Sequence, residues 1–348
     1  MYSHVRHVRA ALLAALSALV SPSSSPASSS RARSVFRCAD PLLFLLAAAL
    51  LWVLVPRLAG ACACGCDVFE VGTASLLPRD TGGTMYFRYD FMDQTTNWHG
   101  DREAPKANND DKVIRSNFFS VGMQYMFNRS WGVMGELPYT ERFFKTTDED
   151  TGRVQGFNHA AIGDVRVEVM YTGFSEDMST GIHSGLKFAS GDFSYPHFDR
   201  DTSIGSGSTD FLFGVYHLGK LPFIAADRPF QWFILANTQI PMWTQDHYRP
   251  GDAFNGSLGA LYEFGKVGFL DDVAPMLNFI GSVRSSDQGA NADHDNSGYD
   301  RLLIAPGAEV RIGGVRVYTD VEFPIYQHVT GNQLVAPVLV KMIMSYDF

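Results

Sequence analysis

Three cysteines at alternate positions are the residues of this chain most suited to chemistry. Cys62, Cys64 and Cys66 lie in the stretch ACACGCDVF, and their thiolates would be soft ligands for Cu(I) or Zn(II). A tetrahedral zinc site takes four ligands, so these three would need a second chain to complete it. Cys62 could instead carry lipid, because LAGAC approaches a lipobox and departs from it at Ala59. An oxidising compartment would favour a disulfide with one cysteine left over, and a tether without chemistry is the fourth interpretation.

The stretch ADHDNSGYD, residues 292–300, is a second candidate for chemistry. It places His294 near Ser297, but their order and spacing differ from the His-x-Ser-Asn-Gly stretch of outer-membrane phospholipase. Nucleophilic catalysis needs the serine within hydrogen-bond reach of its base. Asp293 and Asp295 begin the stretch like a calcium loop, yet Ile304 stands where such a loop has its bidentate acid. We therefore expect a solvated turn here, and a protein that is not an enzyme.

Charged residues inside strand-like segments are the third group. They alternate with apolar residues, so each lies on the polar face of its segment. This group consists of Arg88, Asp90, Asp164, Arg166, Glu168, Lys187, Glu309, Arg311, Arg316, Asp320, Glu322 and Lys341.

The segments that carry these charges show period-2 alternation, which is typical of strands with one apolar face. In the last segment, Met342, Met344 and Tyr346 alternate with Lys341 and Ser345. The same alternation places Ala336 on the apolar face of that segment and Tyr326 on the polar face of the one before. About twelve strands are predicted, at 84–91, 116–128, 131–141, 160–172, 179–189, 208–219, 229–241, 252–264, 273–284, 299–312, 315–326 and 335–348.

The connections between the predicted strands alternate between short and long. Short joints are expected at 128–130, 173–178, 220–228, 265–272 and 313–314, and long polar loops at 92–115, 144–158, 190–207, 242–251, 285–298 and 327–334. Outer-membrane barrels have short periplasmic turns and long extracellular loops, and an even number of strands leaves both termini in the periplasm.

The predicted fold is therefore all-β: a closed antiparallel transmembrane β-barrel of about twelve strands. The apolar faces would meet lipid, where an Arg or Lys at mid-bilayer costs about 2–4 kcal/mol, so the twelve charged residues named above are predicted to line the lumen. Both charge signs are present, and two interpretations stay open, a polar conduit and a salt-bridge network that fills the lumen. A periplasmic or extracellular β-sandwich is the alternative fold.

The two ends of the chain give further predictions. The last strand, with Tyr346 and the terminal Phe348, has the form read by the bacterial barrel-assembly machinery. Near the start, arginines precede the apolar run PLLFLLAAALLWVLV and an Ala-x-Ala site, which predicts a secretory signal peptide. Because another apolar stretch precedes it, we expect the true start to be later, with Val35 as a candidate. The predicted organisation is residues 1–61 as over-extended N-terminus and signal peptide, 62–81 as a cysteine-containing periplasmic segment, and 82–348 as the barrel.

The charge balance excludes one class of partner. The chain has 348 residues and a net charge of −9, with Lys and Arg numbering 28 against 37 Asp and Glu. Phosphate contacts need clustered Lys and Arg, so nucleic acid is not expected as a partner. The partners predicted are the lipid of the cell outer membrane, the barrel-assembly machinery and a small-molecule solute.

From about residue 160 onward the chain resembles a family of bacterial outer-membrane barrels described as phenol meta-pathway or transporter-like proteins. The resemblance lies in AIGDVRVEVMY, GLKFASGDFS, GSGSTDFLFGVY, YRPGDAFNGSLGALYEF, LIAPGAEV and VEFPIYQHVTGNQL. It implies a role in the uptake of small, often aromatic, compounds and assigns no binding residues. The predicted function is a non-enzymatic barrel that passes or binds such solutes without a cofactor. The alternative is a barrel that handles metal or docks a partner through Cys62, Cys64 and Cys66.

Overall fold

The computed structural model describes Phe69 and residues 74–148, 151–221 and 230–348. The chain divides into two compact units, Met1–Arg57 and Leu58–Phe348, and all described residues belong to the second. The described chain includes the 3-10 helices η2 (Lys106–Asn108) and η3 (Arg200–Thr202). In this described part of the chain, no helix has the length and apolar character needed to cross a bilayer.

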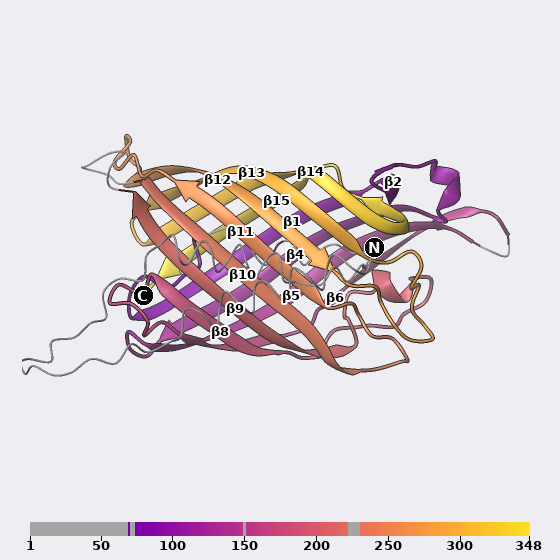
Figure 1. Ribbon diagram of the computed structural model, residues 1–348, viewed down its shortest axis with the longest axis horizontal. Helices are drawn as coiled ribbons and strands as arrows, with labels where there is room; N and C mark the ends of the chain where they lie inside the picture. The colour runs from indigo at the N-terminus through magenta and orange to yellow at the C-terminus, as the bar shows by residue number, and fades with distance from the viewer. Residues whose placement is uncertain (1–68, 70–73, 149–150, 222–229) are drawn as a thin grey trace, which may run out of the picture. The chain divides into compact units, whose positions relative to one another are not determined.

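Strands make up most of the described chain (Figure 1). They are β1 (Gly82–Gln94), β2 (Thr96–Gly100), β3 (Arg102–Glu103), β4 (Asp111–Met126), β5 (Trp131–Thr147), β6 (Val154–Ile162), β7 (Arg166–Tyr171), β8 (Thr180–Lys187), β9 (Ser208–Leu221), β10 (Phe230–Thr244), β11 (Ala253–Leu261), β12 (Asp272–Arg284), β13 (Tyr299–Ile312), β14 (Val315–Val335) and β15 (Leu339–Asp347).

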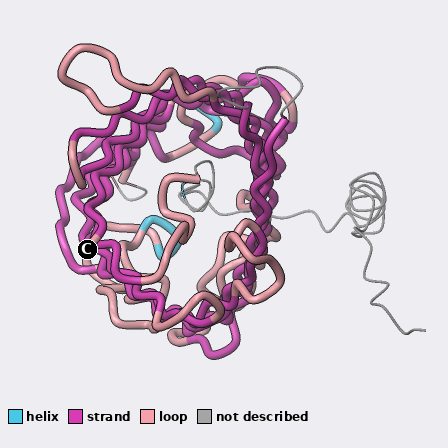
Figure 2. The backbone as a smooth tube through the Cα atoms, turned by 90° about the vertical axis from the view of Figure 1, so that its left-hand side faces the viewer, coloured by secondary structure: helices cyan, strands magenta, loops and turns pink. Residues whose placement is uncertain are grey.

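The strands form one closed antiparallel ring. Its order is β1, β4, β5, β7, β8, β9, β10, β11, β12, β13, β14, β15 and back to β1. β6 pairs with β5 next to β7, so β6 and β7 occupy one interrupted place in the wall. The wall therefore has twelve places, seen end-on in Figure 2. The predicted twelve-stranded closed barrel is confirmed.

The seam of the ring joins the first and the last strand. β1 pairs with β15 from Thr84 opposite Asp347 to Met92 opposite Leu339. Beyond this register, the backbone N–H groups of Gly83 and Phe348 each donate to the other's carbonyl oxygen at 2.8 Å. Closure in this way leaves no unpaired strand edge at the seam, and hydrocarbon would not tolerate such an edge.

The alternation of side chains follows the prediction along most strands. In β15, Met342, Met344 and Tyr346 are exposed on the outer surface, while Lys341 and Ser345 are buried inside. Two assignments were wrong. Ala336 is buried, because it lies in the connection between β14 and β15 rather than on the outer face of a strand. Tyr326 is exposed, because a register shift opposite Leu302 and Leu303 moves this part of β14 by one residue.

The long connections gather at one end of the barrel, as predicted, but three of them are more ordered than expected. The predicted loop 144–158 contains the end of β5 and the first half of β6, which pair with each other. The predicted loop 92–115 contains β2, β3 and η2. The predicted loop 327–334 lies within β14, which runs to Val335 and pairs with β2 beyond the ring. The prediction of a loop at 327–334 was wrong because β2 supplies backbone hydrogen-bond partners for these residues. The alternation of apolar and polar residues within one strand does not indicate such a pairing.

Candidate functional site

Residues that precede β1 pack inside the barrel. Ala74 and Leu77 are buried in an apolar cluster that includes Tyr216 of β9. The guanidinium of Arg316 donates through Nη1 to the carbonyl oxygen of Ser75 at 2.8 Å. Residues 74–78 therefore occupy part of the lumen at the end where the strands join by short turns.

Phe69 packs deeper inside, against strands on both sides of the seam. It is buried in a cluster with Met92 of β1 and Leu339 of β15. Its ring centroid lies 5.9 Å from that of Phe118 in β4, and the Nζ atom of Lys341 lies 5.8 Å from the same centroid. The chain before β1 thus contributes an aromatic ring to the middle of the lumen.

Ion pairs bridge the inner wall around the seam. Arg88 places Nε 3.0 Å from Asp90 Oδ2 and Nη2 3.0 Å from Glu136 Oε1. The Nζ atom of Lys341 lies 3.2 Å from Glu322 Oε1, and both side chains are completely buried. These pairs join β1 to β5 and β14 to β15 on the inner face of the wall.

A second group of ion pairs lies between β7, β8 and β9. The Nζ atom of Lys187 is 2.6 Å from Asp210 Oδ2 and 3.4 Å from Asp164 Oδ2. His183 Nδ1 lies 2.5 Å from Glu168 Oε2. Charged side chains of both signs are therefore held in pairs on the inner wall, and the space that remains between them is the candidate site.

The connection from β8 to β9, residues 188–207, folds into the barrel and narrows it. Arg142 of β5 donates through Nη1 to the carbonyl oxygens of Thr202 and Ser203, the latter at 3.0 Å. Thr202 is completely buried, and Figure 2 shows loop segments within the outline of the ring. We call residues 188–207 the inward loop.

The inward loop also covers the interrupted part of the wall. In the described chain β6 pairs with β5 alone, and the inward loop packs against its residues. His159 Nε2 lies 3.0 Å from Asp192 Oδ2, and the His159 ring stacks on Tyr195 with centroids 3.6 Å apart. Side-chain contacts therefore hold the loop where a further strand pairing is missing.

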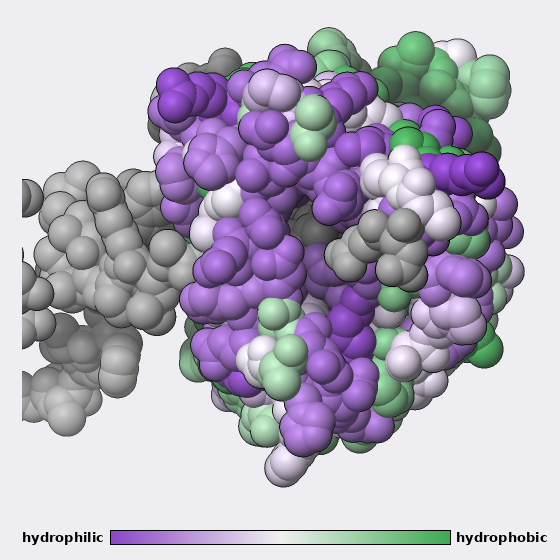
Figure 3. Space-filling view, turned by 90° about the vertical axis from the view of Figure 1, so that its right-hand side faces the viewer, coloured by the Kyte–Doolittle hydropathy of each residue, from purple (hydrophilic) through white to green (hydrophobic). Residues whose placement is uncertain are grey.

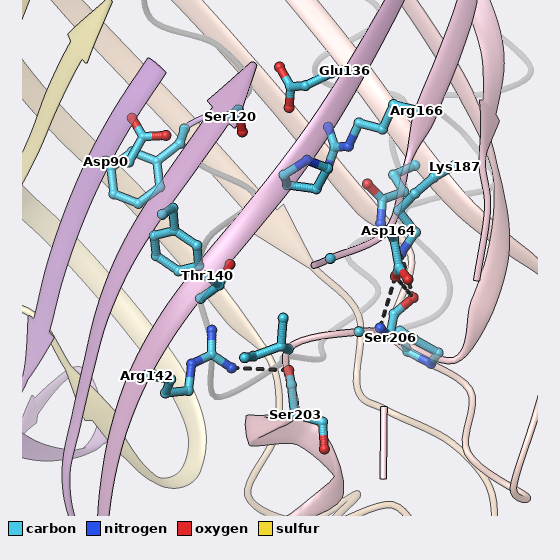
Figure 4. Close-up of a pocket in the computed structure, with 18 of the residues that line it drawn as sticks. Asp90, Ser120, Glu136, Thr140, Arg142, Asp164, Arg166, Lys187, Ser203 and Ser206 are labelled. Atoms are coloured by element: carbon cyan, nitrogen blue, oxygen red, sulfur yellow. Dashed lines mark hydrogen bonds and ion pairs between the residues drawn. The ribbon is translucent and has the colours of Figure 1, made fainter. Parts of the chain in front are cut away.

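A cavity of about 140 Å³ lies between the inward loop and the wall. We call it the lumen cavity. Figure 4 shows its polar side chains, which come from β1, β4, β5, β7 and β8, from the connection before β7 and from the inward loop. Its ionic lining consists of Arg88, Arg142, Arg166, Lys187, Arg200 and Arg284 with Asp90, Glu136, Asp164 and Asp201. Phe69, Phe118 and Tyr248 add aromatic rings. At the end of the barrel with the long connections, the surface is mostly hydrophilic and is hollowed near its centre (Figure 3).

The charged residues predicted from sequence do not all lie at this cavity. Those that line it are Arg88, Asp90, Asp164, Arg166 and Lys187. Those buried elsewhere are Glu168, Arg316, Asp320, Glu322 and Lys341. Glu309 is half-buried and accepts a hydrogen bond from the Ser75 hydroxyl, and Arg311 is exposed near the end of β13.

Other predicted residues lie away from the cavity or outside the described residues. Cys62, Cys64 and Cys66 are among the residues that the structure does not describe, so their metal, lipid or disulfide chemistry stays a prediction. Within the described residues, no group of three His, Cys, Asp or Glu side chains is placed to hold a metal ion. His294 Nδ1 lies 3.1 Å from the backbone oxygen of Asp287, and the Ser297 hydroxyl accepts from the backbone N–H of Asp287.

The sequence reading missed several residues of the cavity. Glu136 and Arg142 alternate in β5 with the exposed Leu137 and Tyr139, so the period-2 pattern was sufficient to place them inside. Arg200 was missed for a different reason. It lies in the inward loop, and no periodicity shows that a loop of this kind turns into the lumen.

Comparisons with known proteins show the fold. No protein-family model and no curated protein matches the chain. Among solved structures, an outer-membrane channel from Pseudomonas putida F1 is similar with a TM-score of 0.60 and 9% identity, covering 80% of this chain and 100% of that one. The β domain of the Bordetella autotransporter BrkA is similar with a TM-score of 0.45 and 12% identity, covering 77% of this chain and 100% of that one. The Pseudomonas putida toluene transporter TodX is similar with a TM-score of 0.40 and 9% identity, covering 83% of this chain and 95% of that one. The first similarity places this chain in the class of outer-membrane β-barrel folds, and the other two carry no argument about it.

Proposed function

We propose that the protein is a channel of the cell outer membrane that passes or binds small solutes and is not an enzyme. The observation that carries this proposal is the combination of a closed barrel, an apolar outer surface and a polar cavity inside. Outward-facing residues such as Val121, Val169 and Leu258 are about half exposed on the barrel surface. Lipid is the solvent that suits such a surface, and a polar lumen is typical of barrels that conduct solutes.

Aromatic residues at the short-turn end support the membrane assignment. Girdles of aromatic side chains mark the bilayer interfaces of outer-membrane barrels. The exposed aromatic residues at this end include Phe127, Trp131, Phe174, Phe264, Phe269, Tyr346 and Phe348. Their arrangement supports placing this end at an interface, with the two terminal strand residues Tyr346 and Phe348 available to the barrel-assembly machinery.

The size of the lumen cavity supports a small solute. Its volume of about 140 Å³ is well below the roughly 300–1,000 Å³ of pockets for drug-sized ligands. The resemblance of residues beyond 160 to barrels of the phenol meta-pathway type adds the proposal that the solute is an aromatic compound. The rings of Phe69 and Phe118 in the cavity lining are compatible with that class.

Planar-bilayer recording tests the proposal. The purified, folded full chain is expected to give discrete current steps in potassium chloride, together with uptake of small solutes in a liposome-swelling assay. Boiled protein, which runs at the mobility of the unfolded chain on gels, serves as the control. Absence of both current and solute flux for a barrel that is folded by this criterion would contradict the channel function.

A further inference from the structure

Arg200 has a setting that differs from the other cations of the lumen cavity. It lies on the inward loop in η3, and only 9% of its side chain is exposed. Its guanidinium carbon lies 4.9 Å from the centroid of the Phe193 ring and 4.4 Å from that of Tyr248. The two rings fix the orientation of the guanidinium group at the cavity surface.

The hydrogen-bonding capacity of Arg200 is only partly used. Its Nη2 atom donates to the carbonyl oxygen of Ser206 at 2.8 Å, and its Nε atom lies 3.7 Å from Asp246 Oδ2 without a hydrogen bond. In the described part of the chain, Nε and Nη1 are buried with no hydrogen-bond partner. A buried donor without an acceptor is costly, so an anionic acceptor in the cavity would be stabilised there. Burial also lowers the pKa of Arg200, while Tyr248, Asp246, Asp164 and Asp201 act in the opposite direction.

The remaining lining of the cavity indicates the kind of anion. Six cationic side chains line it against four acidic ones. The rings of Phe69 and Phe118 lie together on one part of the lining, with centroids 5.9 Å apart, and provide an apolar surface for a flat ring. The small volume leaves room for a single-ring compound.

We propose that the lumen cavity binds a small aromatic monocarboxylate of the benzoate class, with Arg200 as the residue that contacts the carboxylate. The aromatic ring of the ligand lies against Phe69 and Phe118. This inference rests on the proposed channel function for its biological use, but binding at the site is measured without any transport.

Calorimetric titration of the folded full chain in detergent tests the site. The probes are sodium benzoate and benzyl alcohol, which has a similar ring but no charge. Benzoate is expected to bind at least tenfold more tightly than benzyl alcohol. Arg200→Gln is expected to weaken benzoate binding at least tenfold, because charge-assisted hydrogen bonds are lost. The benzoate affinity of Arg200→Lys is expected to lie between those of the unmodified protein and Arg200→Gln.

Arg102→Gln provides the matched control, because Arg102 is exposed on β3 at the same end of the barrel. It removes the same charge and is expected to leave benzoate affinity unchanged. Gel mobility before and after boiling shows that each variant is folded. No saturable benzoate binding, equal affinity for the two probes, or unchanged affinity in Arg200→Gln would each overturn the proposal. Current steps without benzoate binding would refute this site and leave the channel function standing. Benzoate binding without current would support the site and contradict the channel function.

Discussion

Lys341 and Glu322 are completely buried ionic side chains on the adjacent strands β15 and β14. Removing two charges from water is costly, and the attraction at 3.2 Å between them offsets this cost only while both are present. Asp320, also buried, lies on the same inner face of β14. Loss of the lysine would therefore leave two buried acids without their nearest cation.

Lys341→Met is expected to lower the free energy of unfolding by about 3–5 kcal/mol, the range for breaking a buried ion pair. Urea titration of the barrel in lipid vesicles, followed by heat-modifiable gel mobility, measures the change. Lys266→Met, in an exposed turn between β11 and β12, is the control. A loss no larger than that of the control would show that the pair contributes no net stability.

Among the strands, β11 shows how a short element separates two environments. Leu258 is 50% exposed, while the adjacent Ser257 is buried on the other face. Ile234 of β10 and Phe279 of β12 lie opposite Leu258 in the register, so its neighbours on the outer face are also apolar. This position therefore belongs to the apolar surface that lipid would cover.

Leu258→Arg is expected to destabilise the folded barrel in vesicles by about 2–4 kcal/mol, because the charge would face hydrocarbon. Leu258→Ile is the control, and the same urea titration in vesicles measures both. If Leu258→Arg were as stable as Leu258→Ile in lipid, the outer face of β11 would not be in contact with hydrocarbon.

Asp111, the first residue of β4, couples this strand to the inward loop. It lies ten residues before Val121, where the exposed apolar side chains of β4 begin, and so beyond the part that would cross the bilayer. Burial, followed by the charge of Asp199 on the inward loop, raises the pKa of Asp111 to about 7. Because the pKa of a carboxyl in the unfolded chain is near 4, the folded state binds the proton more tightly.

This pKa predicts a pH-dependent loop. Stabilisation by the protonated carboxyl is fully present below about pH 4 and is lost as the pH rises towards about 7. The inward loop should therefore be held more tightly at about pH 6 than at about pH 8, and channel current should be lower at the acidic pH. Asp111→Asn, which stays neutral, is expected to give the low current at both pH values. If the current of Asp111→Asn still differed between about pH 6 and about pH 8, the pH dependence would belong to another group.

The strands were largely predictable from sequence, whereas the inward loop was not. Twelve places in the wall follow from period-2 alternation, because a strand with lipid outside and polar side chains inside must alternate. The position of Arg200 depends on contacts with Phe193, Tyr248 and the carbonyl of Ser206, which join residues with no periodic relation. For the same reason, no periodic pattern indicated that Phe69 and residues 74–78 lie inside the barrel.

At the level of the whole molecule, the chain before β1 obstructs its own lumen. Phe69, Ala74 and Leu77 are buried against the inner wall, and Arg316 holds the backbone of Ser75. The space that a solute can use is therefore smaller than the ring of strands alone would leave.

Deletion of residues 74–78 from the full chain is expected to increase single-channel conductance several-fold, since these residues occupy lumen volume. Stability is expected to fall, because burial of the apolar side chains contributes roughly 25 cal/mol per Å². Deletion within the exposed stretch 102–107 is the control for shortening the chain, and planar-bilayer recording is the measurement. An unchanged conductance would show that the narrowest point lies at the inward loop instead.

The seam between β1 and β15 sets the order of events during folding. Its partners lie at opposite ends of the barrel sequence, so the last strand must be synthesised and exported before the wall can close. Contacts of such large sequence separation form slowly. Residues 74–78 lie shortly before the first of these strands and are enclosed in the finished barrel, so we expect them to be inside the curved sheet before the seam closes. Slow closure would thus give the preceding residues time to reach their place.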